Sequence, residues 1–457
     1  MTVPKNLLTT LVVIGLLSMI AVACGGTGAE PTVTATTVIL DAHATSTSTV
    51  IPEIVAGPTG APSPPTAVPP DTTPTPVQRQ EQHESFTVHD LDIEPLTGSV
   101  FETLLSKLPD NQATREYTRL GDVAGVIAAL GFDPLRPGIP HEEQTQYFED
   151  LVTADFNGFF VPLWEWPAEL RDYQSRLDIY PDMAFDWISV DQFAHSDNFT
   201  FRGDAQPRSY DVALGAFDPA ATMAALAQCD CDQPEIREHG GIEYFAWGDG
   251  NGNAEIQRRL ARPYYDVLGR GPHLLIRDGE AYYTVRDGVI DEHIDVIQGT
   301  SPSLAEVEEY VSAVQWIASM GIVNEITLRN KGFSLDEIVQ VRRGQVTTAE
   351  IVQETSLLMP FTMVATGIGY DGERSFSGLV VAHEDAAIAE SNLKLLLTRL
   401  GTVTPARRGS SYARRWSYLV DRVEIQTSGR FLIARIYFTL PGTPWLMDVP
   451  NSLLVHS

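Results

Sequence analysis

The chain of 457 residues carries 31 basic and 60 acidic side chains, which give a formal net charge of −29. A surface this acidic repels nucleic acid and anionic lipid headgroups, so it argues against a polyanionic partner. With three cysteines, no disulfide framework can hold the fold, and a hydrophobic core drawn from the 43% of hydrophobic residues has to do so.

The first residues have the pattern of an export signal. Lys5 gives a positive start, Leu7 to Ala21 forms an apolar run, and small residues precede Cys24. The run of about 15 residues is shorter than the roughly 20 that cross a bilayer as a helix. The sequence therefore predicts a protein that leaves the cytoplasm.

The segment Ala21 to Gly26 reads Ala-Val-Ala-Cys-Gly-Gly. It resembles the lipobox of bacterial lipoproteins, although Ala21 stands where that family more often has Leu. The resemblance covers residues 1–26 and implies that 1–23 is a signal peptide. It further implies that Cys24 becomes the first mature residue, with diacylglycerol on its thiol and an acyl chain such as palmitate on its amino group. More than one chain gives stable anchoring, here on the extracytoplasmic face of the cell membrane. The alternative is an ordinary secretory signal that leaves Cys24 as a free thiol.

Residues 24–84 form the predicted linker between this anchor and the folded part. They are rich in Thr, Pro, Ser and Ala, as in Thr45 to Thr49 and Pro62 to Pro65. Such a composition cannot bury enough apolar surface to offset its ordering entropy, which predicts a disordered chain. Its span lies between about 40 Å for a flexible coil and ~180 Å for full polyproline extension. A glycosylated stalk is the alternative.

The rest of the chain alternates between helix and strand patterns. Helices are expected at Ser99 to Leu108, Val123 to Leu130, Glu142 to Val152, Pro219 to Leu226, Ser303 to Ala318 and Ala386 to Leu400. Strands are expected at Phe86 to Ile93, Arg115 to Leu120, Ser209 to Phe217 and Ile242 to Trp247. Asp122 and Asp218 are predicted N-caps, and Ser303 to Glu306 is a capping box.

Three hairpins are expected around Gly-containing turns. Their turns are Asp278-Gly279, Asp371-Gly372 and Ser428-Gly429, and Asp-Gly is the dipeptide that a tight type I′ turn prefers. The flanking apolar segments are Leu274 to Val285, Phe361 to Gly369 with Phe376 to His383, and Trp416 to Ile425 with Phe431 to Leu440.

These elements predict an α+β fold of antiparallel sheets built from hairpins, with packed helices. Two segments of the sequence resemble each other: Val212 to Ala221, and Leu379 to Ala387. Each leads from a strand through an acidic residue into an Ala-rich helix. We call this similarity the internal echo. The echo suggests two related halves, 85–330 and 331–457, each with its own antiparallel sheet. One continuous domain is the alternative.

Aromatic residues are dense between Phe156 and Phe201. Exposed on loops, they would form a platform for sugar rings or a partner, with Trp164, Trp166 and Tyr173 as the candidate ligand-binding residues. Buried, they are core under a long irregular connection, which is the more common role of aromatic side chains.

Two glycine-rich motifs are better explained by turns and loops than by ligand sites. Gly367 to Gly372 matches G-x-G-x-x-G, but a strand follows it instead of the helix that a dinucleotide site needs, so we interpret it as turn glycines. Asp249 to Asn253 resembles the start of a calcium loop, but Ala254 and Leu260 replace the required Gly and Glu. A hairpin loop is expected there, with a cation site as the alternative.

No catalytic motif is present. His141-Glu142 and His383-Glu384 lack the second His of a helical zinc motif, and there is neither a nucleophile elbow nor a Walker loop. Single histidines, at positions such as His195, His239, His273 and His293, are usually surface or satisfied core residues. The acidic run Asp291 to Asp295 predicts a solvated helix face. We therefore expect no catalytic residue, no metal and no cofactor.

Cys229 and Cys231 lie in Gln-Cys-Asp-Cys-Asp. Export permits a disulfide between them, across a very small ring of the kind that is easily reduced. The alternatives are a redox role and a metal site with Asp230 and Asp232, but no further Cys or His follows at zinc-site spacing. Two loop thiols after a helix, bridged or not, are the favoured reading.

Together these features predict an extracytoplasmic, membrane-anchored lipoprotein that acts as a non-catalytic binding or envelope module. The lipid anchor at Cys24 attaches it to the membrane. No nucleic acid partner is expected, and the sequence does not identify its ligand. The alternative is an anchored hydrolase of envelope or extracellular polymers that uses a carboxylate pair. A transporter-linked solute-binding protein would show parallel βαβ lobes instead of Asp-Gly hairpins.

Overall fold

The computed structural model describes residues 86–153, 180–197, 208–250, 255, 257, 270–330, 333–334, 357–402, 416–439 and 452–456. They all belong to one unit, residues 79–457. The predicted signal, the lipidated Cys24 and the linker lie outside the described residues.

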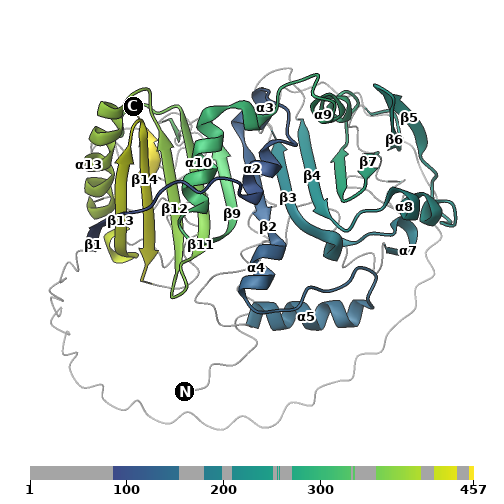
Figure 1. The fold of residues 1–457 in the computed structure, drawn as a ribbon, viewed down its shortest axis with the longest axis horizontal. Coiled ribbons are helices and arrows are strands. Elements are labelled where there is room, and N and C mark those ends of the chain that lie inside the picture. Colours follow the sequence, from purple (N-terminus) through teal and green to yellow (C-terminus); the bar gives the residue numbers. More distant parts are fainter. Residues whose placement is uncertain are drawn as a thin grey trace, which may run out of the picture. The chain divides into compact units, whose positions relative to one another are not determined.

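Thirteen strands form one sheet, which Figure 1 shows running across the molecule. In spatial order they are β1 (Thr87–Asp90), β13 (Val420–Ser428), β14 (Phe431–Phe438), β12 (Ser375–Ala382), β11 (Met363–Tyr370), β9 (Ile322–Arg329), β2 (Thr118–Asp122), β3 (Val190–Asp197), β4 (Ser209–Gly215), β8 (Glu280–Thr284), β7 (His273–Arg277), β6 (Ile242–Ala246) and β5 (Glu235–His239). Neighbours are antiparallel except β1 and β13, which are parallel. A separate parallel pair joins β10 (Phe333–Ser334) to β15 (Val455–His456).

The α+β fold with a mostly antiparallel sheet is thus confirmed, but the prediction of a separate sheet for each half is wrong. β2 and β9 pair antiparallel and join the strands of both parts of the chain into one sheet. Leu120 opposes Ile326 in this pairing, and both are fully buried on the same face. An edge strand with an apolar face is stabilised by pairing with another such edge, which favours one continuous sheet.

Helices cover both faces of the sheet. They are α2 (Val100–Leu105), α3 (Gln112–Glu116), α4 (Val123–Ala129), α5 (His141–Thr153), α7 (Tyr180–Met183), α8 (Pro219–Leu226), α9 (Val289–Ile297), α10 (Glu308–Ala318) and α13 (Ala386–Thr402). Strand side chains alternate between the faces. One face carries a single apolar cluster under α2, α9 and α10. The other carries two separate clusters, one under α13 and one under α4, α5, α7 and α8.

Glycines let α10 pack closely on the sheet. Gly367 of β11 and Gly378 of β12 are cross-strand partners, and Ile317 of α10 lies above both. A Cβ at Gly367 would come within 2.5 Å of Ile317 Cγ2. The start of the G-x-G-x-x-G match therefore lies inside a strand and serves helix packing, which corrects its interpretation as turn glycines.

Most of the local predictions are confirmed. Asp122 caps α4 by accepting from Gly125 N, and Asp218 caps α8 by accepting from Ala220 N at 2.8 Å. The Ser303 capping box forms as predicted, but on a 3₁₀ turn, Leu304–Glu306. The chain leaves the helical conformation at Val307, so α10 begins only at Glu308.

The hairpins also form where expected. β7 and β8 are joined by Asp278 and Gly279, and Gly279 has a φ of +76°. Among the non-glycine residues that the structure describes, only Ala184 has positive φ. Asp278 is therefore outside the left-handed region, and the predicted type I′ turn, which needs positive φ at both positions, is wrong.

Candidate functional site

A histidine held between two carboxylates lies at the centre of the sheet. His195 of β3 donates from Nδ1 to Asp211 Oδ1 of β4 at 2.5 Å, and its Nε2 faces Asp197 Oδ2 at 3.4 Å. Ser209 Oγ donates to the other oxygen of Asp211 at 2.6 Å. Alternation along β3 and β4 places all four side chains on one face, opposite the cluster under α10.

This geometry keeps the imidazole charged. Burial lowers the pKa of His195, but the attraction of Asp211 and Asp197 outweighs it and raises the pKa well above the usual value. Both ring nitrogens face a carboxylate, so neither is available to take a proton from a substrate. The Ser209 hydroxyl bonds to Asp211 and not to the imidazole, so the trio lacks the order of a catalytic triad.

Further polar side chains continue this site toward β9. Arg119 of β2 forms an ion pair with Glu325 of β9, and the Glu325 residue is 5% exposed. The ring of Tyr117 stands edge-on to His195, and the Arg329 guanidinium lies 4.6 Å from the centre of the Tyr117 ring. These charges lie where β2 meets β9, between the two apolar clusters of this face.

The other named histidines have separate surroundings. His239 of β5 lies between Asp295, at 2.9 Å, and Asp291, at 3.6 Å, and its hydrogen bond to Asp295 helps raise its pKa. His273 is buried and contacts Asp287 at 2.9 Å, and burial lowers the pKa of His273 to about 4.

Two histidines are neutral core residues. Burial lowers the pKa of His293 to about 4 and also lowers the pKa of His383. His383 donates from Nδ1 to Arg430 O at 3.0 Å and accepts from Asn392 Nδ2 at 3.0 Å. His383 thus takes part in the packing of α13, whereas Glu384 is exposed.

The acidic run on α9 is not simply a solvated face. Asp291 and Asp295 flank His239, and Glu292 accepts hydrogen bonds from Tyr210, Asn111 and Arg208. The helical period of 3.6 residues directs these carboxylates to different neighbours, while it turns His293 into the core. The prediction of a solvated face is therefore wrong for Glu292.

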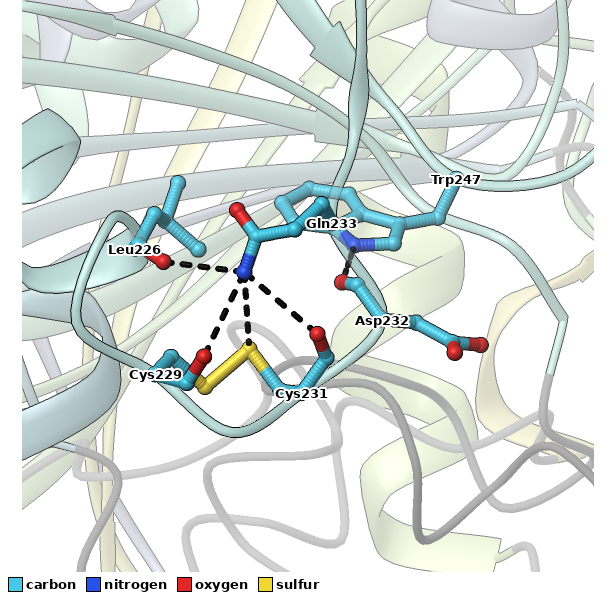
Figure 2. The surroundings of a disulfide bond; sticks show 6 residues. All are labelled: Leu226, Cys229, Cys231, Asp232, Gln233 and Trp247. Atoms are coloured by element: carbon cyan, nitrogen blue, oxygen red, sulfur yellow. Dashed lines mark hydrogen bonds between the residues drawn. A yellow bond between two sulfur atoms is a disulfide. The ribbon is translucent and has the colours of Figure 1, made fainter.

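The two loop cysteines are bridged. Figure 2 shows the disulfide between Cys229 and Cys231, with the side-chain amide of Gln233 above it. Gln233 Nε2 donates to Leu226 O at 2.9 Å and lies 3.9 Å from Cys231 Sγ. Trp247 Nε1 donates to Asp232 O at 2.7 Å and fixes the far side of the loop. Bridged sulfurs cannot act as thiolate ligands, which removes the metal reading of this motif.

The structure leaves several predicted positions untested. The candidate binding residues Trp164, Trp166 and Tyr173 lie outside the described residues, as does most of the calcium-like loop. Within the described ranges, no group of three or more His, Cys, Asp or Glu side chains is arranged to hold a metal ion. No helix in those ranges is both long and apolar enough to cross a membrane.

Sequence reasoning treated His195 as an isolated residue and missed its two carboxylates. A signal was present, because Asp197 is two residues further along the same strand and must point to the same face. Asp211 is 16 residues away on the neighbouring strand, and only the strand register brings it opposite His195.

Comparison with known proteins adds little. No family model matches the chain, and no curated protein matches it. Crystal form III of TP0453 aligns with a TM-score of 0.33 and 9% identity, over 78% of this chain and 97% of that one. Crystal form I of TP0453 aligns with a TM-score of 0.32 and 9% identity, over 80% and 100% of the two chains. Similarity this distant carries no argument about fold or function.

Proposed function

We propose that this protein is an extracytoplasmic lipoprotein, anchored to the cell membrane at Cys24, whose folded part is a non-catalytic binding or envelope module. The observation that carries the proposal is the segment Ala21 to Gly26, which ends a short apolar run with a lipobox-like cysteine. The linker of residues 24–84 then separates the folded part from the membrane surface by about 40 Å as a flexible coil.

The chemistry of the described residues supports the non-catalytic reading. His195, the histidine nearest the centre of the sheet, has both ring nitrogens facing carboxylates. The other flanked histidine, His239, faces Asp291 and Asp295 in the same way. Because both ring nitrogens of His195 are engaged in this way, it is not poised to exchange protons with a substrate; the His239 cluster is partly exposed.

The alternative remains an anchored hydrolase of envelope or extracellular polymers. Its support is the aromatic segment Phe156 to Phe201 together with the 60 acidic residues of the chain. Glycoside hydrolysis needs two carboxyl groups facing a substrate, one of them protonated. Two of the carboxylate pairs in the described ranges, Asp197 with Asp211 and Asp291 with Asp295, each face a histidine instead.

Anchoring is tested by feeding an alkyne-tagged palmitate analogue to a bacterial host that expresses the full chain. We expect the label on the wild-type chain and its loss in Cys24→Ala, with release of that variant from the membrane fraction. Cys229→Ala is the matched control and should keep the label. Label that persists in Cys24→Ala would overturn the anchor.

A saturable tryptophan fluorescence change against sugars, cell-wall fragments, peptides or divalent cations would identify the ligand class. Turnover that one substitution abolishes would instead favour the hydrolase.

We further propose that the folded part consists of two related halves. The strand order supports this proposal. In space, β2-β3-β4-β8-β7 matches β9-β11-β12-β14-β13, and the chain visits the strands of each set in the same sequence. In each set a helix, α8 or α13, follows the third strand. The echo in the sequence falls at this step, and each helix is capped by an aspartate: Asp218 accepts from Ala220 N, and Asp385 accepts from Ile388 N. In this scheme β1 and the β5–β6 hairpin extend the two outer edges of the sheet.

The matching order assigns β9 to the second half, so the proposed boundary moves from 330 to the segment between α9 and α10, near residue 300. Separate chains that end and begin there should associate through β2 and β9 when they are coexpressed. Chains divided at 330 would separate β9 from β11, with which it pairs over most of its length. Recovery of a folded complex only from the division at 330 would contradict the proposed halves.

A further inference from the structure

We propose that the Cys229–Cys231 disulfide is a thiol–disulfide exchange site that reacts with neutral or cationic thiols of small molecules or proteins. The inference rests on the proposed extracytoplasmic location, where a disulfide persists without a reducing thiol pool. It is carried by three features of the loop: the small ring, the contacts that hold the loop independently of the bond, and the charge around it.

The bond contributes little to the fold. A disulfide stabilises mainly by shortening the loops of the unfolded chain, and this effect shrinks with the number of residues enclosed. Cys229 and Cys231 enclose a single residue, Asp230. The bond therefore cannot brace distant parts of the structure, and its opening leaves the sheet and its helices in place.

Other contacts keep the two cysteines together when the bond is open. Cys229 N donates to Ala225 O at 3.0 Å and continues the last turn of α8. Gln233 Nε2 donates to Leu226 O at 2.9 Å, and Trp247 Nε1 donates to Asp232 O at 2.7 Å (Figure 2). Trp247 is 2% exposed, so this last contact is anchored in the core. Reduction and reoxidation can thus proceed without unfolding the loop.

The Gln233 amide distinguishes the two sulfurs. Its Nε2 lies 3.9 Å from Cys231 Sγ and 3.4 Å from the carbonyl oxygens of Cys229 and Cys231, so the hydrogen that is not bonded to Leu226 O can turn from these long contacts to the negative charge that develops on Cys231 Sγ as the bond breaks. An incoming thiolate then attacks Cys229 Sγ: a new S–S bond forms to Cys229, the Cys229–Cys231 bond breaks, and its electron pair leaves on Cys231.

A second thiolate completes the exchange. It attacks the sulfur of the first thiol in the mixed disulfide and releases Cys229 as a thiolate, and the two cysteines take up two protons. The protein disulfide is reduced by two electrons while two partner thiols are oxidised to one disulfide. The reverse sequence would transfer a disulfide's oxidising equivalents to the loop.

The charge of the loop selects the partner. Asp230 lies between the cysteines and Asp232 follows them, whereas Glu235, at the start of the next strand, is paired with Arg237 at 2.9 Å. Carboxylates this close repel anionic thiols and attract cationic ones, most strongly at low ionic strength.

The test uses the full lipidated chain in neutral detergent micelles, with cysteamine, 2-mercaptoethanol and 2-mercaptoethanesulfonate as cationic, neutral and anionic probes. Each rate is divided by the rate of the same thiol with bis(2-hydroxyethyl) disulfide, which corrects for intrinsic reactivity. We expect cysteamine to react about 10-fold faster than the sulfonate at low salt, with the ratio approaching one in 1 M NaCl. A disulfide that outlasts the reference disulfide, or a ratio that ignores salt, would overturn the proposal.

Two sets of variants locate the step. In D230N/D232N the ratio of the two rates should fall several-fold with the fold unchanged, as followed by circular dichroism. At alkaline pH, where both thiols are ionised, bis(2-hydroxyethyl) disulfide should form a mixed disulfide on Cys229 of Cys231→Ser several-fold faster than on Cys231 of Cys229→Ser, with release of 2-mercaptoethanol, because the thiolate that Gln233 stabilises is the weaker nucleophile. Gln233→Met should slow the reaction of the wild-type pair. Equal rates in the two serine variants would contradict the assignment of Cys231 as the leaving sulfur. Alkylation mapped by mass spectrometry also reports a free Cys24 separately, so failure of the anchor is distinguished from failure of the exchange.

Discussion

Two consecutive residues of β4 create opposite environments on the two faces of the sheet. Tyr210 points into the cluster under α9, where its ring centre lies 5.5 Å from that of His293. Asp211 points to the other face and bonds to His195 at 2.5 Å. Burial lowers the pKa of His293 to about 4, whereas burial of His195 is outweighed by its two carboxylates, which raise its pKa well above the usual value.

The difference teaches that burial alone does not decide the charge of a histidine. His293 lies between the rings of Tyr210 and Tyr282, and it bonds only to the carbonyl of Lys107, at 3.3 Å, among the described residues. No carboxylate faces its imidazole there, so desolvation favours the neutral form. Strand alternation, with a period of two, is what places a ring on one face and a charge on the other.

The largest effect is expected from Asp211→Ala, which leaves the His195 imidazolium with the more distant Asp197 alone. Removing one partner of a buried ion pair should lower the free energy of unfolding by about 4 kcal/mol. Denaturant unfolding at neutral pH measures this. Asp421→Ala is the matched control, because its ion pair with Arg374 is solvent-exposed and should contribute about 0.5 kcal/mol. Similar losses in the two variants would show that the His195 cluster is not a buried charged pair.

Acid should lower the stability of the protein through His293, the neutral one of the two histidines. The folded-state pKa of His293, about 4, lies below the usual 6.5, so the unfolded chain takes up the proton first as the pH falls. Stability from this group is present above pH 6.5 and is lost on the way to pH 4, by about 3 kcal/mol in all.

His293→Phe keeps a ring between the two tyrosines and should remove this share of the acid sensitivity, as measured by unfolding at a series of pH values. His273 and His383 have lowered pKa values as well and should keep part of the acid slope. His89→Gln, on the exposed strand β1, serves as control and should leave the slope unchanged. An unaltered slope in His293→Phe would place the acid-sensitive groups elsewhere.

The sequence was sufficient for much of what is decided within a few residues, although the turn type at Asp278-Gly279 was wrong. Asp218 before Pro219 predicted the start of α8, and the Asp278-Gly279 pair predicted the β7–β8 hairpin, because caps and turns depend on local chemistry. It was insufficient for pairings between distant strands. Nothing near Leu120 indicates that β2 adopts β9 as its neighbour, although this contact turns two expected sheets into one.

The same limit applies to the candidate site. The sequence contains His195 and Asp211, but the two side chains meet only because the register of the β3–β4 pairing places them opposite each other. That register is set by the whole strand pair and not by these two residues. The protonation states of His195 and His293 are even harder to predict from the sequence, because they depend on which groups face each ring after folding. Cys229 and Cys231, by contrast, were visible as two nearly adjacent residues, although the sequence left open whether they are bridged.

A smaller effect is expected from Tyr210→Phe, which keeps the ring beside His293 and removes the hydroxyl. That hydroxyl donates to Glu292 at 2.5 Å, and Asn111 and Arg208 also donate to the same carboxylate. Loss of one of three donors to a charged group should lower the free energy of unfolding by about 1.5 kcal/mol. The acid slope should not change, because the ring is what excludes water from His293. A flattened slope would show that the hydroxyl, and not the ring, controls the protonation of His293.

The smallest effect separates the two carboxylates of His195. Asp197 faces the imidazole at 3.4 Å, against 2.5 Å for Asp211, so Asp197→Asn should cost about 1 kcal/mol, well below Asp211→Ala. Because the raised pKa of His195 supplies stability that is lost as the pH rises through it, weakening one carboxylate should shift this alkaline loss to lower pH. The chemical shifts of the imidazole protons, followed against pH, report the change directly. If Asp197→Asn moves the titration as far as Asp211→Asn does, the two carboxylates share the charge equally and the shorter contact has no special role.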